Sequence, residues 1–208
     1  MKLLVATSNP GKLIELREIL AGCDVQLTSL AELGIRAPEE PFETFDENAA
    51  AKAIACAPRA KLWTLADDSG LCVDALDGRP GVHSARFADT DEARRRKLLD
   101  ALRGIPAERR GAHFQCAIAL ASPDALRIYR AEGRVDGSIA EAPRGTNGFG
   151  YDPLFLPDEA PGRTLAQLDS AEKNRLSHRG RALEGLRPLL DRLVRHGDLP
   201  PPQVAERG

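Results

Sequence analysis

An unbroken apolar run at residues 3–6 lies near the start of the chain, and a turn and a helical pattern follow it directly. A strand that is apolar at every position is typical of a sheet buried on both faces. Pro10 and Gly11 mark the turn, and apolar residues at 13, 16, 19 and 20 form the stripe of an amphipathic helix. Strand and helix patterns continue to alternate up to residue 66, and a β-rich stretch and further helices follow. This order predicts an α/β fold on a sheet of mixed direction.

The length of 208 residues is enough for a full hydrophobic core and favours one domain of two lobes, residues 1–195. Three consecutive prolines within 196–208 predict a disordered tail. The 29 basic and 31 acidic residues leave a net charge of −2, so we expect no nucleic-acid partner. No apolar run approaches the ~20 residues that span a bilayer, so we expect no membrane partner.

The cysteines stand at positions 23, 56, 72 and 116, too far apart for a metal knuckle, and three of them lie in apolar runs. We interpret them as reduced, buried thiols, which indicates a cytoplasmic protein. The first residues also turn polar too soon for a signal peptide, which favours the same compartment.

Two aspartates, Asp67 and Asp68, directly follow the strand predicted at 62–66. Two carboxylates this close repel one another and lose water on burial, and a divalent cation is the usual remedy. Glu39 and Glu40 are further candidate ligands, and an aspartate beside the metal can deprotonate a water molecule. The alternative is a simple N-cap or turn, because an aspartate before Ser-Gly is common there.

A second candidate site is the turn at 7–12, which ends in Lys12. Backbone amides at a helix start carry partial positive charge and, with a lysine, suit a phosphate chain. The turn is not a Walker A loop, because Ala6 and Leu13 stand where that motif needs Gly and Ser or Thr. Lys52, on the Ala-rich helix predicted at 46–61, shares a face with Asn48 and could add a phosphate contact. The alternatives are a plain turn and a solvated helix face.

Two later segments favour recognition of a base. The loop at 145–153 combines three glycines with Phe149 and Tyr151, so close backbone approach and ring stacking are both available. The segment at 172–180 places His178 and Arg179 beside a helix start, where donors could read keto oxygens. A buried turn and a capped surface helix are the alternatives. We assign no role to His83 and His113.

Six blocks together resemble one known family, the inosine triphosphate pyrophosphatases, which act on noncanonical purine nucleoside triphosphates. The blocks are TSNPGK at 7–12, FDENA at 45–49 with Lys52, ADDSGL at 66–71, PG at 80–81 with SAR at 84–86, GFGYDP at 148–153, and EK at 172–173 with SHRG at 177–180. They run in the family's order from residue 3 to about residue 194, and no motif is broken.

The resemblance implies an elongated mixed β-sheet with flanking helices, forming two lobes around a central cleft, and a homodimer. It implies Mg²⁺-dependent hydrolysis of dITP, ITP and XTP to the nucleoside monophosphate and pyrophosphate. Asp68 would be the catalytic proton acceptor and a metal ligand. Glu40 would be the second metal ligand, although the adjacent Glu39 could take that place instead. Substrate contacts would come from Thr7, Ser8, Asn9, Pro10, Gly11, Lys12, Lys52 and Ser69 around the phosphates, and from Phe149, Gly150, Tyr151, Asp152, Lys173, His178 and Arg179 around the base and sugar.

Two other functions remain open at this point. One is a pyrophosphatase that removes modified pyrimidine triphosphates, and the other is a nucleotide-binding module without catalysis. The intact acid pair argues against the second alternative.

Overall fold

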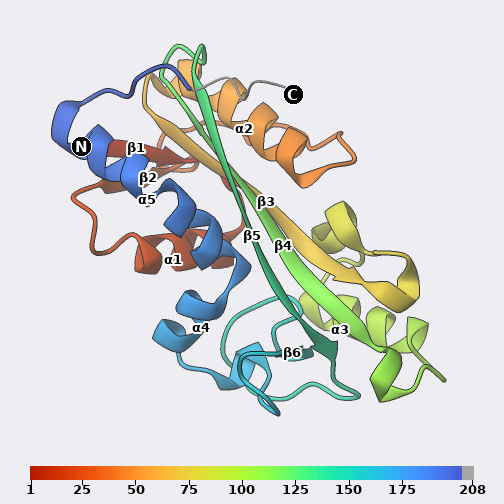
Figure 1. Ribbon diagram of the computed structural model, residues 1–208. Helices are drawn as coiled ribbons and strands as arrows, with labels where there is room; N and C mark the ends of the chain where they lie inside the picture. Colours follow the sequence, from red (N-terminus) through yellow and green to blue (C-terminus); the bar gives the residue numbers. More distant parts are fainter. Residues whose placement is uncertain (203–208) are drawn as a thin grey trace, which may run out of the picture. The chain divides into compact units, whose positions relative to one another are not determined.

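A six-stranded mixed sheet with flanking helices organises the chain, in the strand order β2-β1-β3-β4-β5-β6 (Figure 1). The computed structural model describes residues 1–202. Its strands are β1 (Lys2–Val5), β2 (Gln26–Ser29), β3 (Thr64–Val73), β4 (Gly111–Ala121), β5 (Ile128–Ile139) and β6 (Phe155–Pro157). Its helices are α1 (Pro10–Ile19), α2 (Phe45–Ala60), α3 (Asp91–Ala101), α4 (Ser170–Leu176) and α5 (His178–His196). The predicted mixed α/β class is confirmed, because β1 pairs in parallel with β2 and β3 whereas β5 and β6 are antiparallel.

The chain divides into two compact units. Among the described residues, the first comprises 1–67, 117–131 and 183–202, and the second comprises 68–116 and 132–182. The long strands β3, β4 and β5 therefore each contribute to both units. Figure 1 shows these three strands side by side. The central cleft implied by the family resemblance stays a prediction.

In the first unit the apolar run predicted at 3–6 is β1, and it is buried on both faces as expected. Leu3, Leu4 and Val5 have no exposed surface. At about 25 cal/mol for each Å² of apolar surface removed from water, such side chains stabilise the unit by roughly 2 kcal/mol each. α1 begins at the predicted turn because the Asn9 side chain accepts hydrogen bonds from the amides of Gly11 and Lys12.

The second unit has its own hydrophobic core. It includes Leu71 and Val73 of β3, Phe114 of β4, Val135 of β5 and Leu98 of α3. α3 is strongly charged, yet it buries Leu98 against this core, as its pattern predicts. Thr90 caps the helix by accepting a hydrogen bond from the Ala93 amide.

The predicted position of the acid pair was wrong in one respect. β3 does not end at residue 66 but runs from Thr64 to Val73, so Asp67 and Asp68 lie inside a strand. The reason is that β1 ends at Val5, whose partner is Leu65, while β3 continues beside β4. In the sheet, Asp67 and Asp68 therefore lie just beyond the carboxyl end of the neighbouring strand β1. They do not lie at the end of β3.

Residues 198–200 contact β5 and the residue that precedes it. Leu199 is buried, Arg127 forms an ion pair with Asp198 at 2.8 Å, and the Tyr129 hydroxyl donates to the Pro200 carbonyl. The predicted disordered tail at 196–208 thus includes His196, which ends α5, and a short packed segment at 198–200. Residues 203–208 lie outside the described part of the chain.

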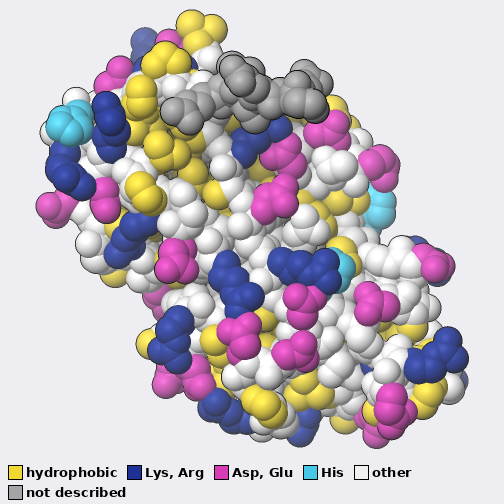
Figure 2. All heavy atoms as spheres, in the orientation of Figure 1, with side chains coloured by type: hydrophobic (Ala, Val, Ile, Leu, Met, Phe, Trp, Pro, Cys, Tyr) yellow, Lys and Arg dark blue, Asp and Glu magenta, His cyan; other side chains and the backbone are white. Residues whose placement is uncertain are grey.

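On the face drawn in Figure 2, basic and acidic side chains are interspersed, as expected for a nearly neutral protein. Within residues 1–202, no helix combines the length and apolar character that crossing a bilayer requires.

Candidate active site

In the first unit, Lys52 of α2 links two acidic segments. Its ammonium lies 2.5 Å from Glu40 Oε1 and 2.5 Å from the backbone oxygen of Asp67. Lys52 is only 5% exposed, so the alternative of a solvated helix face is wrong. A buried ammonium held by a carboxylate and a carbonyl is a strong charge-assisted contact. Lys52 therefore ties the loop of Glu40 to the strand of Asp67.

Asn48 fixes the loop that carries Glu40. Its side-chain oxygen accepts from the Phe42 amide and its side-chain nitrogen donates to the Phe42 carbonyl, both at 3.0 Å. Asn48 is fully buried. The predicted face shared by Asn48 and Lys52 is thus real, and both residues use it to hold the segment around Glu40.

Side-chain hydrogen bonds hold the turn at 7–12, which ends in the cationic Lys12. Thr7 Oγ1 accepts a hydrogen bond from the Asn9 amide, and Asn9 in turn caps α1. The Lys12 ammonium lies 3.3 Å from Asp67 Oδ1, whose side chain has no exposed surface. The solvent-facing lysine of the plain-turn alternative is therefore wrong. Residues 7–10 also border a cavity of about 330 Å³, together with Ser29, Leu30, Ala31, Ile35 and Ala37.

The two aspartates play separate structural parts because neighbouring side chains of a strand point to opposite faces. Asp67 carries the contact with Lys12, whereas Asp68 Oδ1 accepts from the Ser69 amide at 3.0 Å. Both are buried. Hard carboxylate oxygens in this setting suit a divalent cation and a proton transfer.

In the second unit, Phe149 and Tyr151 of the glycine-rich loop take different positions. Tyr151 is buried in the hydrophobic core and its hydroxyl donates to the Ser84 carbonyl at 3.1 Å. Burial raises the pKa of Tyr151 far above its usual value, so this side chain stays neutral. Phe149 is half-buried. Of the two rings, that of Phe149 is the one available for stacking on a base.

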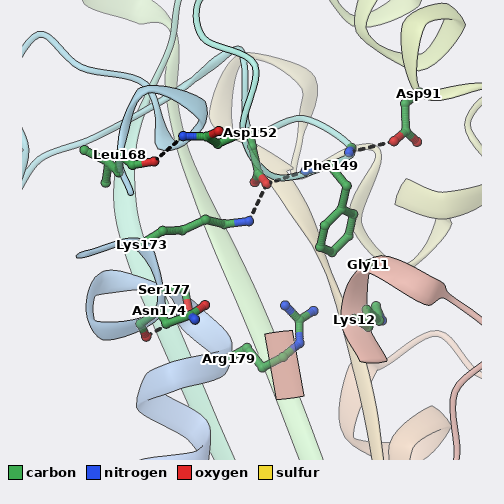
Figure 3. A network of polar contacts seen from close by, with 12 residues as sticks. Gly11, Lys12, Asp91, Phe149, Asp152, Leu168, Lys173, Asn174, Ser177 and Arg179 are labelled. Carbon is green, nitrogen blue, oxygen red and sulfur yellow. Dashed lines mark hydrogen bonds and ion pairs between the residues drawn. The ribbon is translucent and has the colours of Figure 1, made fainter. Parts of the chain in front are cut away.

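Asp152 and Lys173 form a buried ion pair under this ring, with Lys173 Nζ 2.6 Å from Asp152 Oδ2 (Figure 3). The same carboxylate oxygen accepts from the Phe149 amide at 2.8 Å. Lys173 Nζ also lies 5.1 Å from the Phe149 ring centroid, a cation–π contact. The pair thus fixes both the backbone and the ring of Phe149.

Arg179 and His178 start α5, as predicted. Arg179 is 1% exposed, donates to Ser69 Oγ at 3.0 Å, and has its guanidinium carbon 5.9 Å from the Phe149 ring centroid. His178 stacks on Phe114, with an angle of 8° between the rings. The Ser177 hydroxyl accepts from the Gly180 amide and caps the helix, as its sequence pattern indicated. Cationic donors therefore gather beside Phe149.

Sequence reasoning missed two residues of α3 that contact the glycine-rich loop. Asp91 Oδ2 accepts from the Gly150 amide at 2.8 Å, and Arg95 donates to the Gly150 carbonyl at 2.7 Å. Asp91 and Arg95 are four residues apart and share a face of the helix, but nothing in the sequence indicates that this face meets the loop.

The predicted site residues thus form two groups. In the first unit are the turn at 7–12, Glu40, Lys52 and Asp67. In the second unit are Asp68, Ser69, Lys173, His178 and Arg179 with the loop at 149–152. That the two groups act on one substrate stays a prediction.

Comparison with known proteins agrees with the resemblance read from the motifs. The chain is 47% identical over 203 residues to a protein of Desulforamulus reducens named dITP/XTP pyrophosphatase, covering 96% of this chain and all of that protein. A protein of Geobacter sulfurreducens with the same name is 50% identical over 193 residues, covering 91% and 96% of the two chains.

Solved structures give the same result. A HAM1 protein from Coxiella burnetii has a TM-score of 0.82 at 41% identity, covering 92% of this chain and 99% of that one. The sequence also matches the model of the Ham1 family over residues 3–189. With motifs, fold and relatives in agreement, the chain belongs to the Ham1 family.

Proposed function

We infer that this protein is a nucleoside triphosphate pyrophosphatase that hydrolyses noncanonical purine nucleotides such as dITP, ITP and XTP to the monophosphate and pyrophosphate. The observation that carries the assignment is the pairing of two lysines with carboxylates in the first unit, the partly buried Lys12 with Asp67 and the buried Lys52 with Glu40. A triphosphate carries several negative charges, and the ammonium groups of Lys12 and Lys52 can form charge-assisted hydrogen bonds with its phosphate oxygens. The names of the relatives give the substrate class.

We further propose Mg²⁺ as the cofactor, held by Glu40 and Asp68. Among residues 1–202, no three acidic, histidine or cysteine side chains gather closely enough to bind a metal by themselves. This fits Mg²⁺, which uses one or two carboxylates and completes its shell with water and phosphate oxygens. When bound, the ion would neutralise charge on the phosphates.

The protein's own residues supply the rest of the proposed mechanism. Asp68 accepts a proton from the water that attacks the α-phosphorus. Lys12 and Lys52 stabilise the negative charge that builds up on the departing pyrophosphate. The backbone amides of the turn at 7–12 hold the phosphate chain. None of these roles requires a covalent intermediate.

Base selection is assigned to the second unit. The base would stack on Phe149, while Lys173, His178 and Arg179 supply donors to a 6-keto oxygen. Adenine carries an amino group at this position, which would oppose a donor with a donor and leave buried groups unpaired. Mismatches of this kind reject a substrate strongly. ATP is therefore expected to be a poor substrate.

The same proposal includes a homodimer and a cytoplasmic location. The first rests on the family resemblance and is tested by light scattering. The second rests on four free thiols, and burial raises the pKa of the Cys56 and Cys72 thiols, which keeps them protonated and unreactive. Cell fractionation tests it.

A substrate panel with pyrophosphate release as the readout tests the function. We expect release from dITP, ITP and XTP, little from ATP, and none after EDTA treatment. Preferential release from modified pyrimidine triphosphates would contradict the substrate class. Binding of dITP without release would contradict catalysis.

A further inference from the structure

The backbone of Gly150 is held at both its polar groups by one helix. Its amide donates to Asp91 Oδ2 at 2.8 Å, and its carbonyl accepts from Arg95 Nη1 at 2.7 Å. Both contacts involve a charged partner, which makes them stronger than hydrogen bonds between neutral groups. The residue next to Gly150 in the chain is Phe149, so α3 fixes the backbone beside the ring assigned to the base.

The loop depends on such contacts because its conformation is unusual. Gly148 and Gly150 have positive φ angles of 74° and 60°. Around Gly150 there is open space, since a Cβ built there would meet nothing within 4 Å. A glycine without restraint samples many conformations. The turn hydrogen bond from the Asp152 amide to the Phe149 carbonyl closes the loop, and the two hydrogen bonds from α3 restrain Gly150 itself.

Asp91 is itself oriented for this contact. It stands in the first turn of α3, and its second oxygen, Oδ1, lies 2.6 Å from Arg94 Nη1. Arg94 also donates to the Ala88 carbonyl at 2.8 Å, which anchors its guanidinium to the segment before the helix. Figure 3 shows the Asp91 carboxylate directed at the loop, on the side of Phe149 away from Lys173. One oxygen of Asp91 is thus held by the helix while the other holds the loop.

We propose that Asp91 and Arg95 are positioning residues for base selection: they clamp the Gly150 peptide and so fix the Phe149 ring against Lys173 and Arg179. The proposal rests on the function inferred above, in which Phe149 receives the base. The clamp adds to the restraint from Asp152 and Lys173 on the other side of Phe149, and it acts on the base alone because the phosphates are assigned to the first unit. Loss of the clamp would therefore weaken binding of the base and leave the attack on phosphorus unchanged.

The test is a comparison of four substitutions in α3. Asp91→Ala and Arg95→Ala each remove one half of the clamp. Asp91→Asn keeps an oxygen that can accept from the Gly150 amide and is the conservative rescue. Arg96→Ala, at an exposed position of the same helix, is the matched control. Thermal unfolding of all four variants identifies any that fail to fold.

We expect Asp91→Ala and Arg95→Ala to raise KM for dITP about 10-fold, the effect of losing one charge-assisted hydrogen bond, with kcat within about 2-fold of the parent. The inhibition constant of IMP should rise by a similar factor, whereas that of inorganic tripolyphosphate, which has no base, should not change. The ratio of kcat/KM for dITP to kcat/KM for ATP should fall. Asp91→Asn and Arg96→Ala should resemble the parent protein.

The outcomes separate this inference from the proposed function. If the parent protein hydrolyses dITP but both alanine variants keep their KM and IMP affinity, the clamp is refuted and the function stands. If IMP and tripolyphosphate affinities fall together, α3 has a general structural role and the clamp is again refuted. If the parent protein neither hydrolyses dITP nor binds IMP, the proposed function fails and the clamp fails with it.

Discussion

Lys173 Nζ lies 2.6 Å from Asp152 Oδ2, and each side chain is only 7% exposed. The pair joins α4 to the glycine-rich loop, and the same Asp152 oxygen also accepts from the Phe149 amide. A Cβ at Gly148 would lie 2.2 Å from this oxygen, so only glycine permits the loop to approach the pair so closely. The pair therefore fixes the glycine-rich loop against α4.

Removing one partner of this pair should destabilise the protein. We expect Lys173→Met to lower the free energy of unfolding by about 3 kcal/mol, because a buried carboxylate is left without its cation. Urea unfolding measures the change. Lys97→Met is the control: Lys97 makes its contacts at the surface and should cost less than about 1 kcal/mol. Equal losses in the two variants would contradict the role of burial.

Asp68→Asn should leave the fold intact and lower kcat by about 100-fold or more, because the amide cannot accept the proton. Asp67→Asn is the matched variant one residue away. Since Asp67 contacts Lys12 rather than the proposed water, its substitution should act mainly on KM. Steady-state kinetics with dITP measures both. Similar kcat values for the two variants would show that Asp68 has no special part in proton transfer.

Lys12→Ala should raise KM for dITP about 10-fold, with a smaller effect on kcat, because one cation beside the triphosphate is lost. The inhibition constant of tripolyphosphate should rise in parallel. Lys2→Ala, at an exposed residue of β1, is the control and should change neither value. An unchanged KM in Lys12→Ala would remove this lysine from the phosphate site.

Some features of the motifs could be predicted from the sequence because they depend on local chemistry. Ser177 caps the helix that its sequence position suggested, and Lys52, which shares a face with Asn48, is buried and paired. The bounds of β3 could not be predicted from the sequence in the same way. A strand with two aspartates at its centre contradicts the usual apolar pattern, and only its position past the end of β1 explains it.

Contacts between distant segments were also invisible in the sequence. Asp91 and Gly150 are 59 residues apart, and nothing local to either indicates that they meet. Likewise, Tyr151 and Phe149 are both aromatic residues in one loop, yet one is buried in the core and the other is not. Such outcomes depend on how elements pack, which spacing along one segment does not encode.

His113 should make the protein less stable in mild acid. Burial is the main cause that lowers its pKa, with Arg134 adding to it, and its Nδ1 has no hydrogen-bond partner among the described residues. A histidine whose pKa is lowered by folding takes up its proton more readily when unfolded. Its contribution is therefore neutral above the unfolded pKa of ~6.5 and becomes destabilising as pH falls below it.

The check is urea unfolding at pH 7.5 and pH 5.5 for the parent protein and two variants. We expect His113→Gln to lose less stability between these values than the parent, since one acid-sensitive group is gone. His83→Gln, at an exposed histidine, should behave like the parent. If His113→Gln lost as much stability as the parent between pH 7.5 and pH 5.5, His113 would not be the acid-sensitive group.

Hydrolysis of dITP in ¹⁸O-labelled water with Mg²⁺ identifies the phosphorus that water attacks. We expect dIMP and pyrophosphate in equal amounts, with the label in dIMP, because water attacks the α-phosphorus. Label in pyrophosphate, or release of dIDP and inorganic phosphate, would contradict it.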